Sequence, residues 1–321
     1  MIRWEAHACL PLHPDASFEP IRQYRELGVS YVSINIGMDM NPLDQILRTI
    51  AGFRATIAAA PQEFRLVERA ADIERCAAEG VLAVGFDLEG AVPLLEQPEM
   101  VEVFRQLGVR QMHLAYNRNN SVAGGCHDEP QGLTPLGHRV VEAINRAGVL
   151  MDCSHTGRRC SLDVMAASSA PVIFSHANPL ALVEHGRNIT DEQIRACAAT
   201  GGVVCLSGVS KFLGHPAPGA EQVARHARYV ADLVGVGHVG IGLDISFREP
   251  HLQDDPPPPY DPTYWWPRSA GYDRTSQPST YTPMQTWLEL PPALGAVGMS
   301  DADIAQVLGG NMMRVARQVW G

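Results

Sequence analysis

The sequence is poor in basic residues. Its 321 residues include 25 Lys and Arg against 35 Asp and Glu, a formal net charge of −10, and no Lys/Arg-rich run offsets this balance locally. Nucleic acids and anionic membrane surfaces both require a basic protein surface. The composition therefore argues against both as partners.

Long hydrophobic runs are also missing. No uninterrupted apolar stretch approaches the roughly 20 residues that cross a bilayer. The first residues, Met1–His7, lack the basic-then-apolar order of a secretory signal, and Trp320–Gly321 carries no hydrophobic tail or lipidation box. We therefore expect a cytoplasmic protein that does not enter a membrane.

A regular cysteine framework is absent as well. The seven cysteines are odd in number and irregularly spaced, which suits a reducing compartment better than a set of disulfides. Five of them fall in apolar or helical stretches, where we expect small buried side chains: Cys76, Cys153, Cys160, Cys197 and Cys205.

What the sequence does have is an alternation of strand-like and helical segments from one end to the other. The expected strands are Ile2–Leu10, Val29–Gly37, Val81–Leu88, Val109–Tyr116, Val149–Cys153, Pro171–Phe174, Gly202–Leu206 and His238–Leu243. The expected helices are Glu19–Leu27, Pro42–Ala60, Ala71–Ala78, Pro98–Leu107, Pro135–Ala147, Arg159–Ser168, Asp191–Thr200 and Gln222–Leu233. Periodicity leaves the short apolar segment Phe64–Val67 unassigned.

Short, apolar, non-alternating strands between amphipathic helices indicate parallel strands covered by helices. Eight such units favour a closed (β/α)8 TIM-type barrel, of the metal-dependent hydrolase kind, over an open doubly wound sheet. No Gly-x-Gly-x-x-Gly follows the first strand, and no linker divides the chain. We expect residues 1–321 to form a single barrel domain.

The one low-complexity segment, Asp254–Pro267, follows the last expected strand. Loops at that end of a barrel surround its active site. Trp265 and Trp266 are equally consistent with a cap over a pocket and with a surface loop or a subunit contact.

Metal-type ligands recur where the expected strands end. His7 and Cys9 lie two apart on the first strand, so their side chains point the same way. The other strand ends carry Glu89, Tyr116, His155, His176 and Asp244. Imidazoles and carboxylates on one face suit Zn2+, and a carboxylate can bridge two ions. Asp87 shares a face with Glu89, so it either orients a ligand from behind or serves a cap or loop.

These motifs, in this order, resemble the membrane (renal) dipeptidase family of zinc peptidases, within the amidohydrolase group. The similar segments are His7-Ala8-Cys9-Leu10-Pro11, Leu88-Glu89-Gly90, Asp152-Cys153-Ser154-His155, Phe174-Ser175-His176, Gly186-Arg187-Asn188, His238–Asp244 and Gly309-Gly310-Asn311. The resemblance implies that Glu89 bridges the metals, Asp244 is catalytic, and Arg187, with Asn188 beside it, holds the carboxylate of the substrate. It also implies a homodimer.

Two positions depart from the family pattern. Cys9 stands where the family has a metal-binding aspartate, so the number of zinc ions, one or two, stays open. Tyr116 stands where the family has a histidine that contacts substrate; a phenol donates one hydrogen bond but cannot carry the positive charge of imidazole. His113 is not expected to substitute, because three positions back along a strand places it on the other face.

The expected function is hydrolysis of small dipeptides by metal-activated water. His7, Cys9 and Glu89 would hold one Zn2+, and Glu89, His155 and His176 the other, with Asp244 as the base and Tyr116 beside the carbonyl. Two alternatives remain open. One is a related amidohydrolase acting on a cyclic dipeptide or an N-acyl amino acid. The other is a catalytically silent metal-binding relative.

Overall fold

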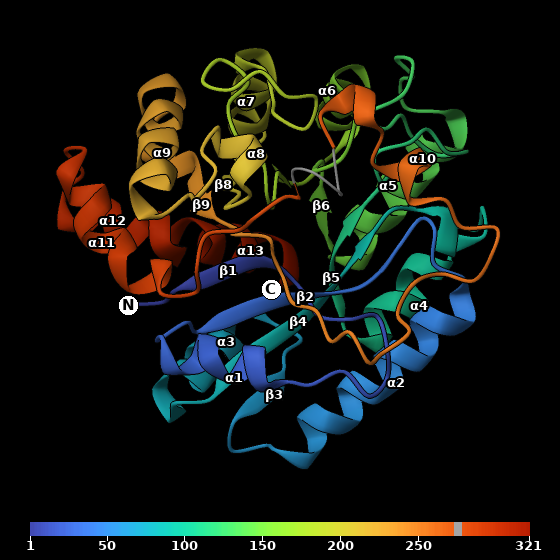
Figure 1. The fold of residues 1–321 in the computed structure, drawn as a ribbon, viewed down its shortest axis with the longest axis horizontal. Helices are drawn as coiled ribbons and strands as arrows, with labels where there is room; N and C mark the ends of the chain where they lie inside the picture. The colour runs from blue at the N-terminus through green and yellow to red at the C-terminus, as the bar shows by residue number, and fades with distance from the viewer. Residues whose placement is uncertain (273–277) are drawn as a thin grey trace.

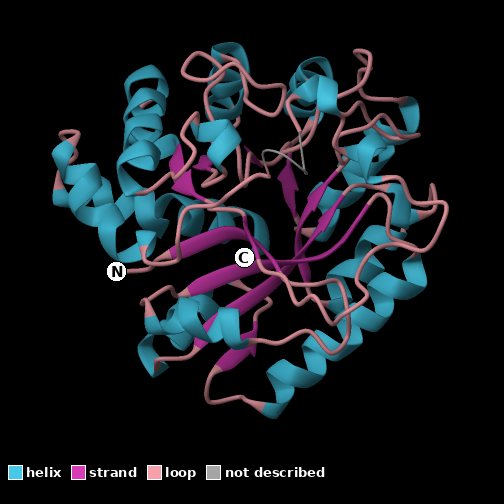
Figure 2. Cartoon of the chain, in the orientation of Figure 1, coloured by secondary structure: helices cyan, strands magenta, loops and turns pink. Residues whose placement is uncertain are grey.

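The computed structural model describes residues 1–272 and 278–321. Parallel strands in its centre are surrounded by helices, as Figures 1 and 2 show. The main path of strands is β10 (Ile245–Ser246), β1 (Trp4–Cys9), β2 (Tyr31–Met38), β4 (Leu82–Glu89), β5 (Val109–His113), β6 (Leu150–Asp152) and β7 (Val172–Ile173). A second pair, β8 (Val204–Leu206) and β9 (Val239–Ile241), is also parallel.

The β8–β9 pair lies between the two edges of the main sheet. A parallel bridge joins Phe174, just after β7, to Val204 in β8. On the other side, the Asp244 amide donates to the His7 carbonyl (3.2 Å), and β10 pairs with β1. The eight predicted strands are therefore all present and form the (β/α)8 barrel expected from the sequence.

The unassigned segment at 64–67 forms a strand, β3 (Phe64–Leu66), outside this ring. It pairs with the first half of β4, where Phe64 lies opposite Leu82 and Leu66 opposite Val84. The strand β5 pairs with the second half of β4, starting at Phe86. One edge of β4 thus serves two strands in turn, which a pattern of apolar residues does not reveal.

Helices pack around the strands of the barrel and over its ends. They are α1 (Glu19–Glu26), α2 (Leu43–Ala59), α3 (Ala70–Glu79), α4 (Met100–Leu107), α5 (Pro135–Ala147), α6 (Arg158–Ala167), α7 (Asp191–Ala199), α8 (Ser210–Leu213), α9 (Ala220–Val234), α10 (Pro262–Trp265), α11 (Thr286–Ala296), α12 (Asp301–Ala305) and α13 (Asn311–Trp320). Their ends follow local chemistry. In α5, Pro135 occupies the first turn, the Thr134 hydroxyl accepts from the Gly137 amide, and Gly148 ends the helix in a left-handed conformation.

An aromatic cluster fills the end of the barrel opposite the candidate site. The ring of Trp4, at the start of β1, lies 5.4 Å from that of Trp320 in α13 and 4.0 Å from that of Tyr31. The Trp320 indole also donates to the Arg110 carbonyl (3.2 Å). Because α13 closes this end, the carboxyl ends of the strands form the accessible face.

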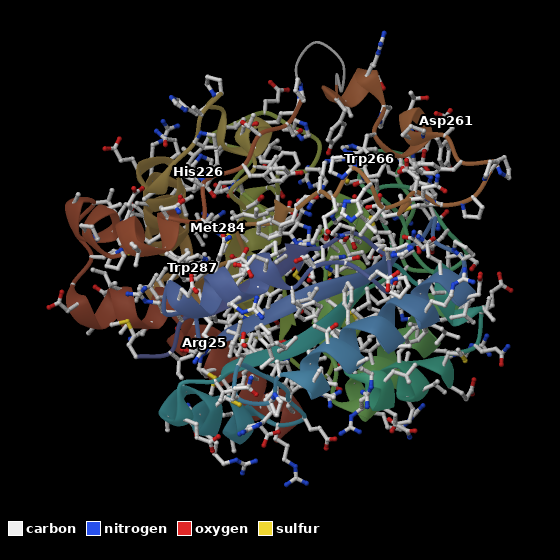
Figure 3. The ribbon with its side chains drawn as sticks, turned by 60° about the horizontal axis from the view of Figure 1, so that its bottom comes forward. Arg25, His226, Asp261, Trp266, Met284 and Trp287 are labelled. Atoms are coloured by element: carbon white, nitrogen blue, oxygen red, sulfur yellow. The ribbon has the colours of Figure 1, made fainter. Side chains whose placement is uncertain are left out.

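The segment 254–267 lies over that accessible face (Figure 3). Asn117 Nδ2 donates to the Trp265 carbonyl (3.0 Å), and Arg118 donates to the Tyr264 carbonyl while its guanidinium stacks over the Tyr264 ring (4.6 Å). The rings of Trp265 and Trp266 lie 6.3 and 5.9 Å from that of Tyr116. Of the two interpretations left open by the sequence, this placement favours the cap.

No helix in the part of the chain that the structure describes has the length and apolar character to cross a membrane.

His226, labelled in Figure 3, is a buried histidine in the helix α9. Neither ring nitrogen has a hydrogen-bond partner within the described ranges, and burial lowers its pKa from 6.5 to about 4. The unfolded chain therefore binds a proton between these pH values when the folded protein does not. Stability should fall as pH drops through this window, by about 3 kcal/mol from this residue.

Replacing His226 with leucine should remove that share of the pH dependence. We expect urea denaturation of the metal-free protein to show a smaller loss of unfolding free energy between pH 7 and pH 4.5 in His226→Leu than in the unmodified chain. The exposed His251 offers a matched control. Equal losses in both variants would contradict the expectation.

Candidate metal centre and active site

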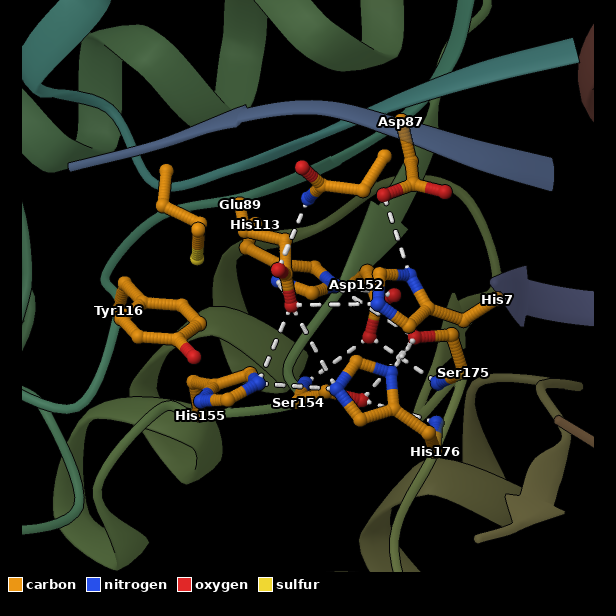
Figure 4. A network of polar contacts seen from close by, with 12 residues as sticks. His7, Asp87, Glu89, His113, Tyr116, Asp152, Ser154, His155, Ser175 and His176 are labelled. Carbon is orange, nitrogen blue, oxygen red and sulfur yellow. Dashed lines mark hydrogen bonds and ion pairs between the residues drawn. The ribbon is translucent and has the colours of Figure 1, made fainter. Parts of the chain in front are cut away.

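Residues from five different strand ends meet at the carboxyl face of the barrel (Figure 4). Three clusters have ligand atoms that all lie within 4.8 Å of one another: His7 with Cys9 and Glu89, Glu89 with His155 and His176, and His7 with His176 and Asp244. The structure thus brings together the five candidate metal ligands expected from the sequence, and it places the predicted catalytic residue Asp244 in a cluster with two of them.

Glu89, the last residue of β4, lies in the middle of these clusters. Its Oε1 is 3.1 Å from His155 Nε2, 3.5 Å from His176 Nε2 and 3.6 Å from His7 Nε2. Asn35 donates to the other oxygen, Oε2 (2.8 Å). Burial raises the pKa of Glu89 to about 7, although His7 and His113 lower it.

Glu89 Oε1 is buried and has no hydrogen-bond partner among the described residues. A buried carboxylate oxygen without a partner is costly. A cation held between this oxygen and the imidazole nitrogens would remove that cost. The donor set of nitrogen, oxygen and sulfur therefore fits a metal ion.

Each of the histidines is oriented by a second residue. His7 Nδ1 lies 3.1 Å from Asp87 Oδ1, and the Ser33 hydroxyl donates to Asp87 Oδ2 (2.7 Å). Such partners fix which ring nitrogen faces a metal. Asp87 is a buried residue within β4, so of its two readings the orienting one agrees with the structure, and a cap or loop role does not.

His155 and His176 are held in the same way. His155 Nδ1 is 2.7 Å from Asn117 Oδ1, and His176 Nδ1 is 2.7 Å from the Ser175 hydroxyl. Both therefore present Nε2 to the centre, where the two Nε2 atoms are 2.9 Å apart. Burial holds the pKa of both well below the usual range, which keeps the imidazoles neutral, as metal ligation requires.

Cys9, at the end of β1, places its Sγ 3.3 Å from His7 Nε2. Burial raises the pKa of this thiol to about 12. The side chain is thus a protonated thiol unless a cation stabilises the thiolate.

Asp244 follows β9 at the rim of the centre. Its Oδ1 is 3.8 Å from His7 Nε2, and its side chain keeps 17% of its surface exposed, so solvent and small molecules can reach it. Burial raises the pKa of Asp244 to about 6, against the lowering effects of His7 and Arg187.

Three residues of the site adopt left-handed backbone conformations without being glycine. The φ angles are 63° at His155, 58° at Asp244 and 59° at Asn117. Such conformations cost roughly 1–3 kcal/mol each and cluster at functional sites. Here all three residues lie in the loops that follow the strands β5, β6 and β9.

Tyr116 and Arg187 line the centre on two sides. The Tyr116 ring stacks on that of His155, with centroids 4.1 Å apart. Arg187 is buried, and its Nη2 donates to the His176 carbonyl (3.2 Å). Among the described residues, its Nε has no hydrogen-bond partner, and its guanidinium forms no ion pair. A buried guanidinium without a carboxylate is ready to bind an anion.

Asn188 has different contacts. Its Nδ2 donates to the Val183 carbonyl (2.9 Å) and to the Phe212 carbonyl (3.0 Å). These bonds use both hydrogens of the amide and hold the loop that carries Arg187. Asn188 thus supports that loop, while its buried Oδ1 has no hydrogen-bond partner among the described residues, so its role in binding substrate stays a prediction.

The expected fifth segment of strand, Val109–Tyr116, is shorter in the structure, and this changes the surroundings of His113. The chain was expected to continue as a strand to residue 116, which would put His113 and Tyr116 on opposite faces. However, β5 ends at His113, so alternation does not apply beyond it. His113 is buried in the barrel, with Nδ1 3.6 Å from Glu89 Oε1. The signal that could have revealed it is register, because His113 pairs directly with Glu89.

The family model of the membrane dipeptidases, peptidase family M19, matches residues 37–251. This chain belongs to that family. A dipeptidase family member, dipeptidase tcpJ of Claviceps purpurea, is 27% identical over 259 residues, covering 79% of this chain and 55% of that protein. An uncharacterised protein in the pqqA 5′ region of Klebsiella pneumoniae is 30% identical over 220 residues and is covered to 80%. The chain spans only about half of the first two curated relatives, 55% and 44%.

Solved structures agree on the fold. An amidohydrolase from Pseudomonas aeruginosa superposes with a TM-score of 0.87 at 27% identity, covering 100% of this chain and 97% of that one. A metallo peptidase from Rhodobacter sphaeroides, liganded with a phosphinate mimic of L-Ala-D-Ala, gives a TM-score of 0.78 at 20% identity, covering 100% and 99%. The second likeness concerns the fold alone.

Proposed function

We propose that this member of the M19 family is a zinc-dependent dipeptidase that hydrolyses small dipeptides with a free carboxylate. The observation that carries the proposal is the buried Oε1 of Glu89, which has no hydrogen-bond partner among the described residues and lies 3.1 to 3.6 Å from the Nε2 atoms of three histidines. The Claviceps relative, named a dipeptidase, supports the substrate class. The candidate residues run from His7 to Asp244, so we treat 1–321 as one functional domain.

Zinc is the proposed metal because the donor set combines imidazole, carboxylate and thiol. His7, Cys9 and Glu89 would hold one ion, and Glu89, His155 and His176 another. When bound, Zn2+ polarises the peptide carbonyl and lowers the pKa of the attacking water.

The protein itself supplies proton transfer. Asp244 lies beside the clusters, partly exposed, with a pKa of about 6, so it is mainly a carboxylate at neutral pH. A base near neutrality both accepts and returns protons efficiently. In this proposal Asp244 takes the proton of the attacking water and passes it to the leaving amine.

Binding and orientation fall to Arg187 and Tyr116. The Nε of Arg187, which has no hydrogen-bond partner among the described residues, can pair with the C-terminal carboxylate of a dipeptide. The Tyr116 ring, stacked on His155, places a phenol beside the metal ligands, where its hydroxyl can donate to the oxygen on which negative charge develops.

The test compares four substrates with the zinc-loaded protein: a dipeptide, its C-terminal amide, the cyclic dipeptide and an N-acetyl amino acid. We expect rapid cleavage of the free dipeptide, weak cleavage of the amide, loss of activity with a chelator and its return with Zn2+. In Arg187→Met the preference for the free dipeptide over its amide should largely disappear.

The other outcomes separate the alternatives. Cleavage of only the cyclic dipeptide or the N-acetyl amino acid would assign a related amidase, which Tyr116 in place of the family histidine would explain. Zinc binding without cleavage of any L,L or L,D dipeptide, or of the other amides, would identify a silent relative and overturn the proposal.

The thiol of Cys9 should set the choice of metal. Thiolates prefer soft cations, and carboxylates prefer hard ones. In Cys9→Asp we expect the preference for Zn2+ over Mn2+ to fall by about tenfold or more. Equilibrium dialysis with elemental analysis measures it, and Cys9→Ser, which offers neither ligand, is the control. An unchanged preference in Cys9→Asp would place the thiol outside the metal centre.

A further inference from the structure

We propose that His113 is a positioning residue of the metal centre, which holds Glu89 from inside the barrel and links it to Asp152. The inference rests on the proposed metal site but not on the identity of the substrate. Nothing in the motifs that identify the family points to this histidine.

His113 lies between two buried carboxylates. Its Nδ1 is 3.6 Å from Glu89 Oε1, and its Nε2 is 2.6 Å from Asp152 Oδ2. All three side chains are buried. The register explains the arrangement, because Glu89 pairs with His113 and His113 with Asp152 on the adjacent parallel strands β4, β5 and β6.

The geometry does not make His113 a metal ligand. Among the described residues it belongs to none of the clusters whose ligand atoms lie within 4.8 Å of one another. Its ring centre is 5.8 Å from that of His155 and 5.5 Å from that of His176. His113 therefore acts on a bound ion through other residues: through Glu89, and through the Ser175 hydroxyl, which lies 3.5 Å from its Nε2.

The contact with Asp152 fixes the His113 ring. Its bond to Asp152 sets the ring plane and directs Nδ1, which has no hydrogen-bond partner among the described residues, towards Glu89 Oε1. Asn35 donates to the opposite oxygen, Oε2. The carboxylate that is shared by two of the clusters thus has a hydrogen bond at one oxygen and the His113 ring at ion-pair distance, 3.6 Å, from the other.

Asp152 also connects His113 to the histidine ligands. Asp152 Oδ1 accepts from the amides of Ser154 (2.9 Å) and Ser175 (3.1 Å). The Ser175 hydroxyl in turn lies 2.7 Å from His176 Nδ1. The same carboxylate that orients His113 therefore also holds the turn that carries His176. Partners of this kind are typically worth 10–100-fold in metal affinity.

The test measures zinc affinity by competition with a chromophoric chelator in the full-length protein. We expect the dissociation constant for Zn2+ to rise about 10–100-fold in His113→Leu. In His113→Gln, whose amide can still donate to one carboxylate, affinity should partly recover. His226→Gln is the matched control, a buried histidine outside the site, and should bind zinc as the unmodified chain does.

Two further measurements separate positioning from a general structural role. The melting temperature of the chelator-treated His113→Gln protein should stay close to that of the unmodified chain, while its zinc affinity falls. If His113→Leu does not fold, Asp152→Asn replaces it as the test variant. The double variant with Asp152→Asn and His113→Gln should lose less zinc binding free energy than the sum of the losses in the two single variants.

Zinc affinity within twofold of the unmodified chain in His113→Gln and Asp152→Asn would overturn the proposal. A large drop in the melting temperature of the chelator-treated variant, together with the loss of zinc affinity, would also overturn it, because both changes would then follow from impaired folding. Absence of dipeptide cleavage in a protein that binds zinc tightly would instead remove the proposed function and leave this inference intact.

Discussion

Replacing Glu89 with alanine is expected to remove all specifically bound metal and to reduce dipeptide hydrolysis to that of the metal-free protein. Glu89 is common to the cluster with His7 and Cys9 and to the cluster with His155 and His176. Its loss also leaves the three imidazoles without the anion that balances the charge of a cation. No other single substitution among the candidate ligands interrupts both clusters in this way.

Metal content per chain, measured by elemental analysis after gel filtration, decides the matter. His155→Ala is the matched comparison, because it interrupts only one of the two clusters and should retain metal at the other. Asn35→Ala, which frees Glu89 Oε2 but keeps the carboxylate, should weaken binding without abolishing it. Full metal occupancy in Glu89→Ala would exclude a shared ligand.

The second large effect is expected from Asp244→Asn. Asparagine has the same shape as aspartate but cannot accept a proton, so turnover of a dipeptide should fall on the order of 10²–10⁴-fold. Metal content should not change, because His7, Cys9, Glu89, His155 and His176 all remain. Steady-state kinetics should show the loss in kcat, with little change in KM.

The combination of the two readouts makes this prediction specific. Asp244 Oδ1 lies 3.8 Å from His7 Nε2 and belongs to a third cluster with His7 and His176. If metal is lost together with activity, Asp244 is a ligand. If turnover is unchanged and metal is kept, the base is another residue.

Much of the architecture follows from the sequence because parallel strands leave a strong local signal. Most of the eight strands are short, largely apolar runs, and every ligand candidate lies within three residues of the end of one of them. Since the carboxyl ends of the strands meet on one face, His7, Glu89, His155 and His176 could be expected together before any geometry was known.

What the sequence analysis missed depends on where strands stop and how they pair. The prediction that His113 does not take the role of the histidine missing at position 116 rested on strand alternation, which was extended three residues past the true end of β5. Strand ends are set by long-range pairing, which local patterns do not encode. Asn117, which orients His155, lies in a loop with a left-handed backbone conformation, and no periodicity marks such a residue. The pairing of β3 with half of β4 was hidden for the same reason.

The closure of the barrel between its first and last strands has a consequence for how the protein is made. The strand of His7 is flanked by β10, and the His7 carbonyl accepts from the amide of Asp244. Residues 8–243 must be synthesised before this neighbour exists. The strand β1 therefore keeps one edge unpaired during that part of translation, and the cluster of His7, His176 and Asp244 cannot form earlier.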